Sequence, residues 1–356
     1  MTHLFSAAGL SVALVAVFGV LLPWLAMRAL VPALSGGPLE TANYRGRPVS
    51  ATLGAVWPIW ALGLFVGQTL LDAVVTLGWN PLSGAEAFSR IATTPLSMPL
   101  FSMPFLLIAG TFAFGLVDDA FGSYHAKGFR GHLAALRHGR LTTGMLKLLG
   151  VGAIAFVYGN SAAAGVLDRS GVTVGDAAYA WLYVGAWLLS ACAIAFSANL
   201  VNLLDCRPGR ALKAYAVLVI APAVTYALTV TASYNHQTDA LVGVIEGIGM
   251  AEWEVTVTAV AFVLALLGPV LAVWRFDLGE RAMLGDSGAN VMGAVVGYLL
   301  TGTLPLAGLA IAVAALLGLN LLSERVSFSA IIERTPPLAF LDRIGCQRGS
   351  EGQESH

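Results

Sequence analysis

The chain has 356 residues, of which 57% are hydrophobic and only 11% are charged, and its mean hydropathy is +0.79. Because an ordinary soluble domain carries about 25% charged residues, this composition excludes a water-soluble globular protein. The net charge of −1 indicates no particular partner, and no nucleic acid partner is predicted. The three cysteines follow no metal-ligand spacing, so we expect reduced thiols without disulfides.

Apolar stretches of the length that crosses a membrane, about 20 residues, recur along the whole chain. The first is predicted to be a span rather than a cleaved signal peptide, because no soluble region follows it. We predict an all-α, polytopic integral membrane bundle, with one domain over residues 1–346 and a disordered polar tail over 347–356. The nine predicted spans are residues 5–33, 51–78, 99–117, 143–166, 177–198, 212–232, 254–274, 287–303 and 305–323.

Basic residues fall almost entirely in one set of the predicted loops. Seventeen of the nineteen Lys and Arg residues lie on the side of the C-terminal tail, and only Arg90 and Arg169 lie on the other. The positive-inside rule therefore predicts an N-terminus outside and a cytoplasmic tail, in a multi-pass protein of the inner or plasma membrane. Pro305 is predicted to mark a tight outer turn, because one helix over 287–323 would be about twice the required length.

Carboxylate and amide side chains gather at the predicted cytoplasmic ends of the spans. Adjacent carboxylates are costly without a cation nearby, and a hard divalent ion with oxygen ligands is the favoured partner. Mg²⁺ binds through one or two carboxylates and completes its shell with water and phosphate oxygens, so the pattern predicts a metal-dependent site for a phosphorylated substrate. The clusters are Asp118 and Asp119 in "GLVDDAFG", Asn199, Asn202 and Asp205 in "NLVNLLDCRPGR", and Asp286 in "MLGDSGAN".

The spacing and the neighbours of these clusters support the same interpretation. Asn199, Asn202 and Asp205 are three residues apart and would share one face of a continuing helix. Gly285 and Gly288 bracket Asp286 and would let backbone approach a ligand. One lysine, three arginines and three histidines in the 123–144 segment indicate an anionic substrate. Each feature also has a purely structural interpretation, as a helix cap, as a contact between helices or as an orientation signal.

The order of these motifs resembles that of the polyprenyl-phosphate N-acetylhexosamine-1-phosphate transferases (glycosyltransferase family 4), and the resemblance covers nearly the whole chain. Members carry a DD pair after the third span, an N-x-x-N-x-x-D run after the fifth and a G-D-x-G run after the seventh. Here these are Asp118–Asp119, Asn199 to Asp205 and Gly285 to Gly288, and "NYRGRPV" from Asn43 is similar to the family's N-x-x-G signature.

The resemblance implies a membrane bundle of nine to eleven spans with a cytoplasmic catalytic cleft and Mg²⁺, or Mn²⁺, as cofactor. It implies undecaprenyl phosphate as acceptor, a UDP-activated amino sugar as donor, release of UMP, and a place in cell-wall or surface-glycan synthesis. Asp118, Asp119 and Asp286 would be catalytic, with Asp286, Asp118 and Asn202 as metal ligands. The implied substrate-binding residues are Asn43, Lys127, Lys147, Asn199, Asn202 and Asp205.

Three departures from the family pattern leave the donor sugar open and indicate a divergent member. Members commonly have ten or eleven spans, whereas nine are predicted here. Pro208 replaces the second acid of the usual D-G-x-D-G continuation, and the last inner loop contains no histidine. Two alternative functions are a catalytically silent scaffold that binds lipid phosphate and a transporter of lipid-linked or anionic solutes. The sequence also leaves a homodimer open. The candidates to replace the missing histidines are Glu324, Arg325, Asp342 and Arg343.

Overall fold

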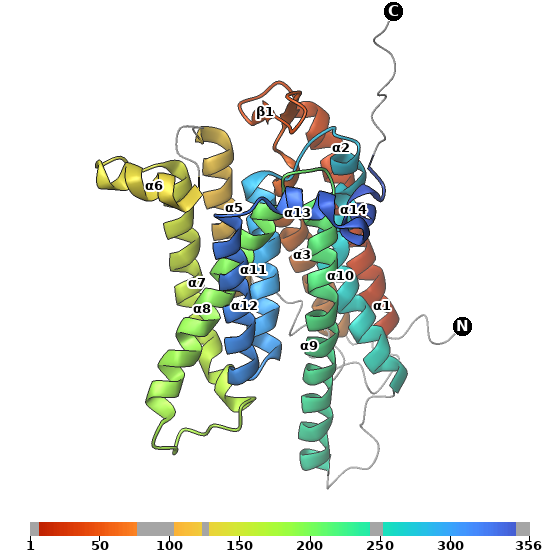
Figure 1. Cartoon of the computed structure of the whole chain (residues 1–356). Helices are drawn as coiled ribbons and strands as arrows, with labels where there is room; N and C mark the ends of the chain where they lie inside the picture. Colours follow the sequence, from red (N-terminus) through yellow and green to blue (C-terminus); the bar gives the residue numbers. More distant parts are fainter. Residues whose placement is uncertain (1–6, 77–102, 123–127, 243–251, 347–356) are drawn as a thin grey trace, which may run out of the picture.

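The computed structural model describes residues 7–76, 103–122, 128–242 and 252–346 (Figure 1). The predicted tail, Lys127 and the whole 77–102 region, with Arg90, lie outside these ranges. Within them the chain is almost wholly helical, with one two-stranded antiparallel hairpin. The all-α class predicted from composition is therefore confirmed.

The first long helix is formed by α1 (Ala7–Leu14), the π-helical turn η2 (Val15–Leu21) and α2 (Leu22–Ala33). The hairpin β1 (Glu40–Ala42) and β2 (Pro48–Ser50), the 3-10 turn η3 (Leu53–Ala55) and α3 (Val56–Thr76) follow. The remaining elements are α5 (Met103–Phe121), α6 (Gly128–Arg137), α7 (Thr143–Asp168), α8 (Tyr179–Leu204), α9 (Arg210–Val242), α10 (Glu252–Leu278), α11 (Gly285–Thr303), α12 (Leu306–Ser323), α13 (Phe328–Arg334) and α14 (Pro336–Arg343).

Seven helices of the described residues are long and apolar enough to cross a membrane. The two other predicted spans correspond to α9 and α11, which are helical but do not belong to this set. The protein is thus a helical, membrane-embedded chain, while the count of nine spans and the cytoplasmic side stay predictions. The seven are Gly9–Ala33, Leu53–Leu71, Pro104–Phe121, Thr143–Asp168, Tyr179–Leu204, Ala259–Leu278 and Leu306–Ser323.

Helix α11 lies in the middle of the bundle, packed against α5, α8 and α9. Its glycines permit this closeness, because a Cβ on Gly293 would collide with the Ser197 carbonyl and one on Gly297 with the backbone of Ile194. The helix ends at Thr303 and α12 begins at Leu306, so Pro305 marks a turn between two helices, as predicted.

The largest core cluster lies between α2, α3, α9, α10 and α11. Pro269 inside α10 has no N–H to donate to the carbonyl of Ala265, four residues earlier. The buried indole of Trp60 on α3 donates to that carbonyl at 2.8 Å instead. The proline is therefore accommodated by a hydrogen bond from a neighbouring helix.

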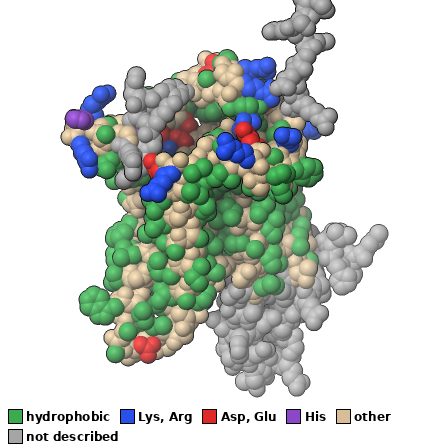
Figure 2. All heavy atoms as spheres, in the orientation of Figure 1, with side chains coloured by type: hydrophobic (Ala, Val, Ile, Leu, Met, Phe, Trp, Pro, Cys, Tyr) green, Lys and Arg blue, Asp and Glu red, His purple; other side chains and the backbone are tan. Residues whose placement is uncertain are grey.

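The loops that carry most of the charge meet at one end of the bundle, where the hairpin, α6, α13 and α14 also lie (Figure 1). Figure 2 shows Lys and Arg side chains concentrated there, above a body covered by hydrophobic side chains. We call this end the polar end. Arg169 is one of the two basic residues predicted for the other face. It lies away from the polar end, where it donates to the carbonyls of Thr301 and Leu304 at the C-terminal end of α11.

Candidate active site

Lys147, near the start of α7, lies between two carboxylates from different helices. Its Nζ is 2.7 Å from Asp118 Oδ2 on α5 and 2.6 Å from Asp286 Oδ2 on α11. The lysine side chain is only 15% exposed, so these contacts are largely shielded from solvent. Three predicted site residues that are up to 168 positions apart in the chain are thus in direct contact.

Asp119 binds the first turn of α11, through two backbone N–H groups and the Ser287 side chain. Its Oδ1 accepts the N–H of Asp286 at 2.7 Å, and its Oδ2 accepts the N–H of Ser287 at 2.9 Å. The first N–H groups of a helix have no partner within the helix, and a carboxylate there also interacts favourably with the helix dipole. Asp119 therefore positions the segment that carries Asp286.

Three glycines allow the segments around Asp119 and Asp286 to pack closely against each other. Gly285 has φ +65°, and a Cβ there would lie 2.7 Å from Asp119 Oδ2. A Cβ on Gly115 would lie 2.6 Å from the Asp286 carbonyl, and one on Gly54 would collide with Ser287. The glycines around Asp286 thus serve its placement, and their predicted approach to a ligand stays a prediction.

Two further carboxylates flank a cavity of about 250 Å³ next to this cluster. Burial, together with the charges of Asp277, Asp286 and Asp119, raises the pKa of Asp205 well above its usual range. Asp277 is 3% exposed, and its Oδ2 accepts the N–H of Gly209 at 2.5 Å. Sequence reasoning missed Asp277, although an aspartate in the last turn of an apolar span was a usable signal.

The hairpin forms another wall of the cavity, and Asn43 shapes it. Its Oδ1 accepts the N–H groups of Arg45 at 2.9 Å and Arg47 at 3.0 Å, while its Nδ2 donates to Glu280 at 3.2 Å. Glu280 also pairs with Arg45 at 3.2 Å. Asn43 therefore closes the turn and fastens it to the loop between α10 and α11, and its predicted substrate contact is not tested by these bonds.

Helix α8 contains Asn199 and Asn202 at the predicted spacing but ends at Leu204, before Asp205. Asn199 donates to Asn320 on α12 at 2.6 Å, which directs its amide away from the carboxylates and matches the structural interpretation of a contact between helices. Asn202 is half-buried in the last turn. Because α8 ends at Leu204, Asp205 leaves the helix with ψ 46° and turns toward the cavity.

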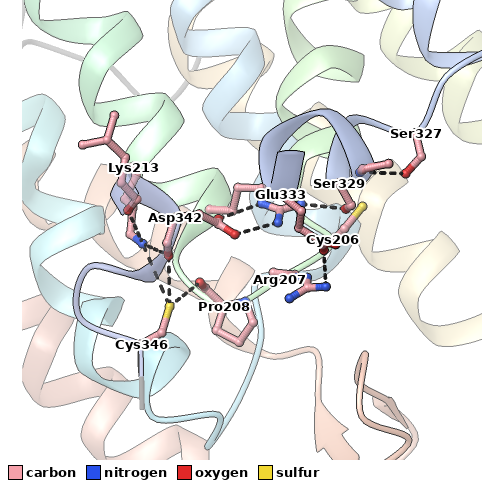
Figure 3. Close-up of polar contacts among 12 residues, drawn as sticks. Cys206, Arg207, Pro208, Lys213, Ser327, Ser329, Glu333, Asp342 and Cys346 are labelled. Atoms are coloured by element: carbon pink, nitrogen blue, oxygen red, sulfur yellow. Dashed lines mark hydrogen bonds and ion pairs between the residues drawn. The ribbon is translucent and has the colours of Figure 1, made fainter. Parts of the chain in front are cut away.

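The C-terminal helices are tied to the loop that follows Asp205 (Figure 3). Arg210 donates to both oxygens of Asp342, at 2.9 and 2.8 Å, and to Ser329 at 2.7 Å. These bonds lower the pKa of Asp342. Lys213 donates to the Asp342 carbonyl at 2.6 Å, and Arg207 pairs with Glu333. Asp342, a candidate to replace the missing histidines, is therefore engaged in holding α14.

The positions of the carboxylates can be compared with the ligands that the predicted Mg²⁺ requires. In the parts of the chain that the structure describes, no three His, Cys, Asp or Glu side chains are arranged as metal ligands. Asp118 and Asp286 nevertheless bring two carboxylate oxygens within 2.7 Å of one point, where the Lys147 ammonium lies. Mg²⁺ commonly takes one or two carboxylates plus water and phosphate oxygens, so this donor pair fits it once the Lys147 ammonium moves away from that point.

A comparison of the chain with models of known protein families finds no match, and a search among curated proteins finds none either. The resemblance therefore rests on the sequence motifs alone.

Proposed function

We propose that the chain transfers a sugar-1-phosphate, an N-acetylhexosamine-1-phosphate by resemblance, from a UDP-sugar to undecaprenyl phosphate and releases UMP. The observation that carries the proposal is the contact of Lys147 with Asp118 and Asp286 at the polar end of an apolar bundle. A lipid phosphate held in the membrane and a soluble nucleotide sugar can both reach a site at that boundary.

In this reaction an oxygen of the lipid phosphate attacks the phosphorus that bears the sugar. A P–O bond forms there, the P–O bond to the bridging oxygen of the diphosphate breaks, and UMP leaves with that oxygen. The attacking group is already anionic, so the protein mainly has to position two anions and offset their repulsion. Asp118 orients the acceptor phosphate and takes its remaining proton, while Lys147 supplies positive charge to the diphosphate.

Asp118 and Asp286 would hold Mg²⁺, or Mn²⁺ in its place. The bound cation supplies charge neutralisation for the diphosphate. Asp119 keeps Asp286 in position through the first turn of α11. Asp205, whose raised pKa favours the protonated acid, can donate a hydrogen bond to a uracil carbonyl in the adjoining cavity.

The test uses the purified full chain in detergent with Mg²⁺, undecaprenyl phosphate and a panel of UDP-sugars. Release of UMP together with a lipid-linked sugar from at least one donor supports the proposal. Binding of lipid phosphate without UMP from any donor, by protein that elutes as a folded species, supports the scaffold alternative. Solute uptake into proteoliposomes without a lipid product supports the transporter.

A further inference from the structure

A second hollow, of about 540 Å³, lies at the polar end between α2 and α10. It is lined by Trp24 and Arg28 of α2, by Trp274 and Arg275 of α10, and by Arg281 in the loop before α11. It shares no lining residue with the cavity beside Asp205 and contains none of the carboxylates of the candidate active site. The hollow is therefore a separate feature.

The three arginines of this hollow are exposed, and none of them forms an ion pair with a carboxylate in the described residues. The nearest acids in sequence are engaged elsewhere, since Asp277 accepts from Gly209 and Glu280 pairs with Arg45. Three arginines thus line one hollow, and none of them has a carboxylate partner in the described residues. Their forked donors match phosphate oxygens in geometry as well as charge.

The two tryptophans indicate the depth at which the hollow lies in a membrane. Trp24 and Trp274 are half-buried, nine residues before the end of α2 at Ala33 and four before the end of α10 at Leu278. The Arg28 guanidinium lies 5.5 Å from the centre of the Trp24 ring. Tryptophan is enriched at the level of lipid head groups, where one part of the ring is apolar and the other wet. The arginines therefore lie where lipid phosphates are found.

Exposed leucines continue the arginine faces toward the apolar part of each helix. On α2, Leu21 and Leu25 are 45% and 49% exposed, and they precede Arg28 at helical spacing. On α10, Leu271 is 50% exposed and lies one turn before Arg275. Each helix thus presents an arginine next to a strip of exposed leucine. This surface is complementary to a molecule with a phosphate head group and hydrocarbon chains.

We propose that this hollow binds an anionic membrane phospholipid. Its phosphate oxygens accept hydrogen bonds from Arg28, Arg275 and Arg281, and its acyl chains lie along the exposed leucines of α2 and α10. Three guanidinium groups exceed what one phosphate monoanion needs. A lipid with two phosphates, such as cardiolipin, is therefore expected to bind more tightly than phosphatidylglycerol, and a zwitterionic lipid more weakly than either.

Native mass spectrometry of the full chain, titrated in detergent with cardiolipin, phosphatidylglycerol or phosphatidylcholine, tests this. Each single Arg→Gln substitution at positions 28, 275 and 281 should weaken cardiolipin binding about fivefold, and the triple variant about a hundredfold. The matched control replaces Arg137, Arg140 and Arg325, which are exposed at the same end, and should bind like wild type. If the triple variant elutes as misfolded protein, the single variants decide.

Three outcomes would overturn the proposal. The control triple could weaken binding as much as the test triple, which would mean general attraction to a basic surface. Inorganic phosphate alone could compete at the concentration of the lipid, which would mean a site for soluble anions. Undecaprenyl phosphate could displace cardiolipin at equal concentration, which would make the hollow an acceptor site. None of these measurements requires transferase activity, so they stand apart from the proposed function.

Discussion

Asp119 accepts the backbone N–H of Asp286 at 2.7 Å and so joins the end of α5 to the first turn of α11. The other carboxylate oxygen accepts the next N–H, from Ser287, at 2.9 Å. Two neighbouring acids therefore differ in function: Asp118 meets Lys147, whereas Asp119 holds the backbone that carries the third acid. Substitutions of Asp118 and Asp119 are therefore expected to affect the protein differently.

Replacing Asp119 by Ala should lower stability, because it leaves two first-turn N–H groups of α11 without their acceptor. The expected loss is about 1–2 kcal/mol, as for other helix-capping side chains. Thermal unfolding of the purified variant in detergent measures it. The matched variant Asp118→Ala removes a contact with a side chain and no backbone cap. Equal stability of Asp119→Ala and wild type would exclude the positioning role.

Replacing Gly285 by Ala should also destabilise the protein. The residue has φ +65°, and the added Cβ would lie 2.7 Å from Asp119 Oδ2. The left-handed conformation alone costs an L-residue about 1–2 kcal/mol. Gly152, inside α7, is the control, because a Cβ there would have no neighbouring atom within 4 Å, and its replacement by Ala should leave the unfolding temperature unchanged or slightly higher. A similar response at both positions would contradict this account.

Replacing Lys147 by Gln should make stability dependent on a divalent cation. The variant leaves Asp118 and Asp286 side by side without their shared positive charge, which raises the free energy of the folded state. Millimolar Mg²⁺ should then raise the unfolding temperature of the variant more than that of wild type, and chelation should remove the difference. An unfolding temperature that does not respond to Mg²⁺ in the variant would argue against these carboxylates as metal ligands.

The pair of Arg210 and Asp342 predicts how acid affects the C-terminal helices. The two side chains are 5% and 13% exposed, and Arg210 lowers the pKa of Asp342. A lowered folded-state pKa stabilises the protein above the unfolded value of about 3.9, and this stabilisation is lost as pH falls through the lower, folded value. The docking of α14 should therefore persist at pH 5 and weaken only in stronger acid.

Alkylation of Cys346, followed by peptide mass spectrometry, reports on this docking, because the half-buried thiol lies 3.4 Å from the Pro208 carbonyl. Asp342→Asn should label several-fold faster than wild type at pH 7. Because only the thiolate is alkylated, the rates are compared at pH 7. The unfolding temperatures of the two proteins should converge as the pH falls below the folded-state pKa of Asp342. A ratio of the two labelling rates near one at pH 7 would show that the ion pair does not hold α14.

The sequence was enough to predict that Asp118, Lys147 and Asp286 lie near one another. It was not enough to predict the contact that each side chain makes. Local composition fixes where apolar helices lie, and helix ends place Asp118, Lys147 and Asp286 at one boundary. The Pro305 turn followed from the length needed to cross a membrane. The partner of Asn199 could not be predicted, because Asn320 lies 121 residues away and its approach depends on how α8 and α12 pack.

The capping role of Asp119 was likewise beyond the sequence, since a DD pair does not say which acid faces a side chain and which faces backbone. Asp277 was overlooked because it follows the apolar run that ends at 274 and stands among Arg275, Glu280 and Arg281, where an acid is easily interpreted as part of a charged loop. Its significance becomes clear only once the loop at Gly209 approaches to 2.5 Å.

The most direct test of the central claim compares two Asp→Asn variants in the UMP-release assay with Mg²⁺ and undecaprenyl phosphate. Asp286→Asn should lose at least about a hundredfold in rate, since it removes a charge from the reacting site. Asp176→Asn, at an exposed turn between α7 and α8, should match wild type, because an amide can still accept the Thr173 N–H. UMP release by Asp286→Asn at the wild-type rate would contradict the account.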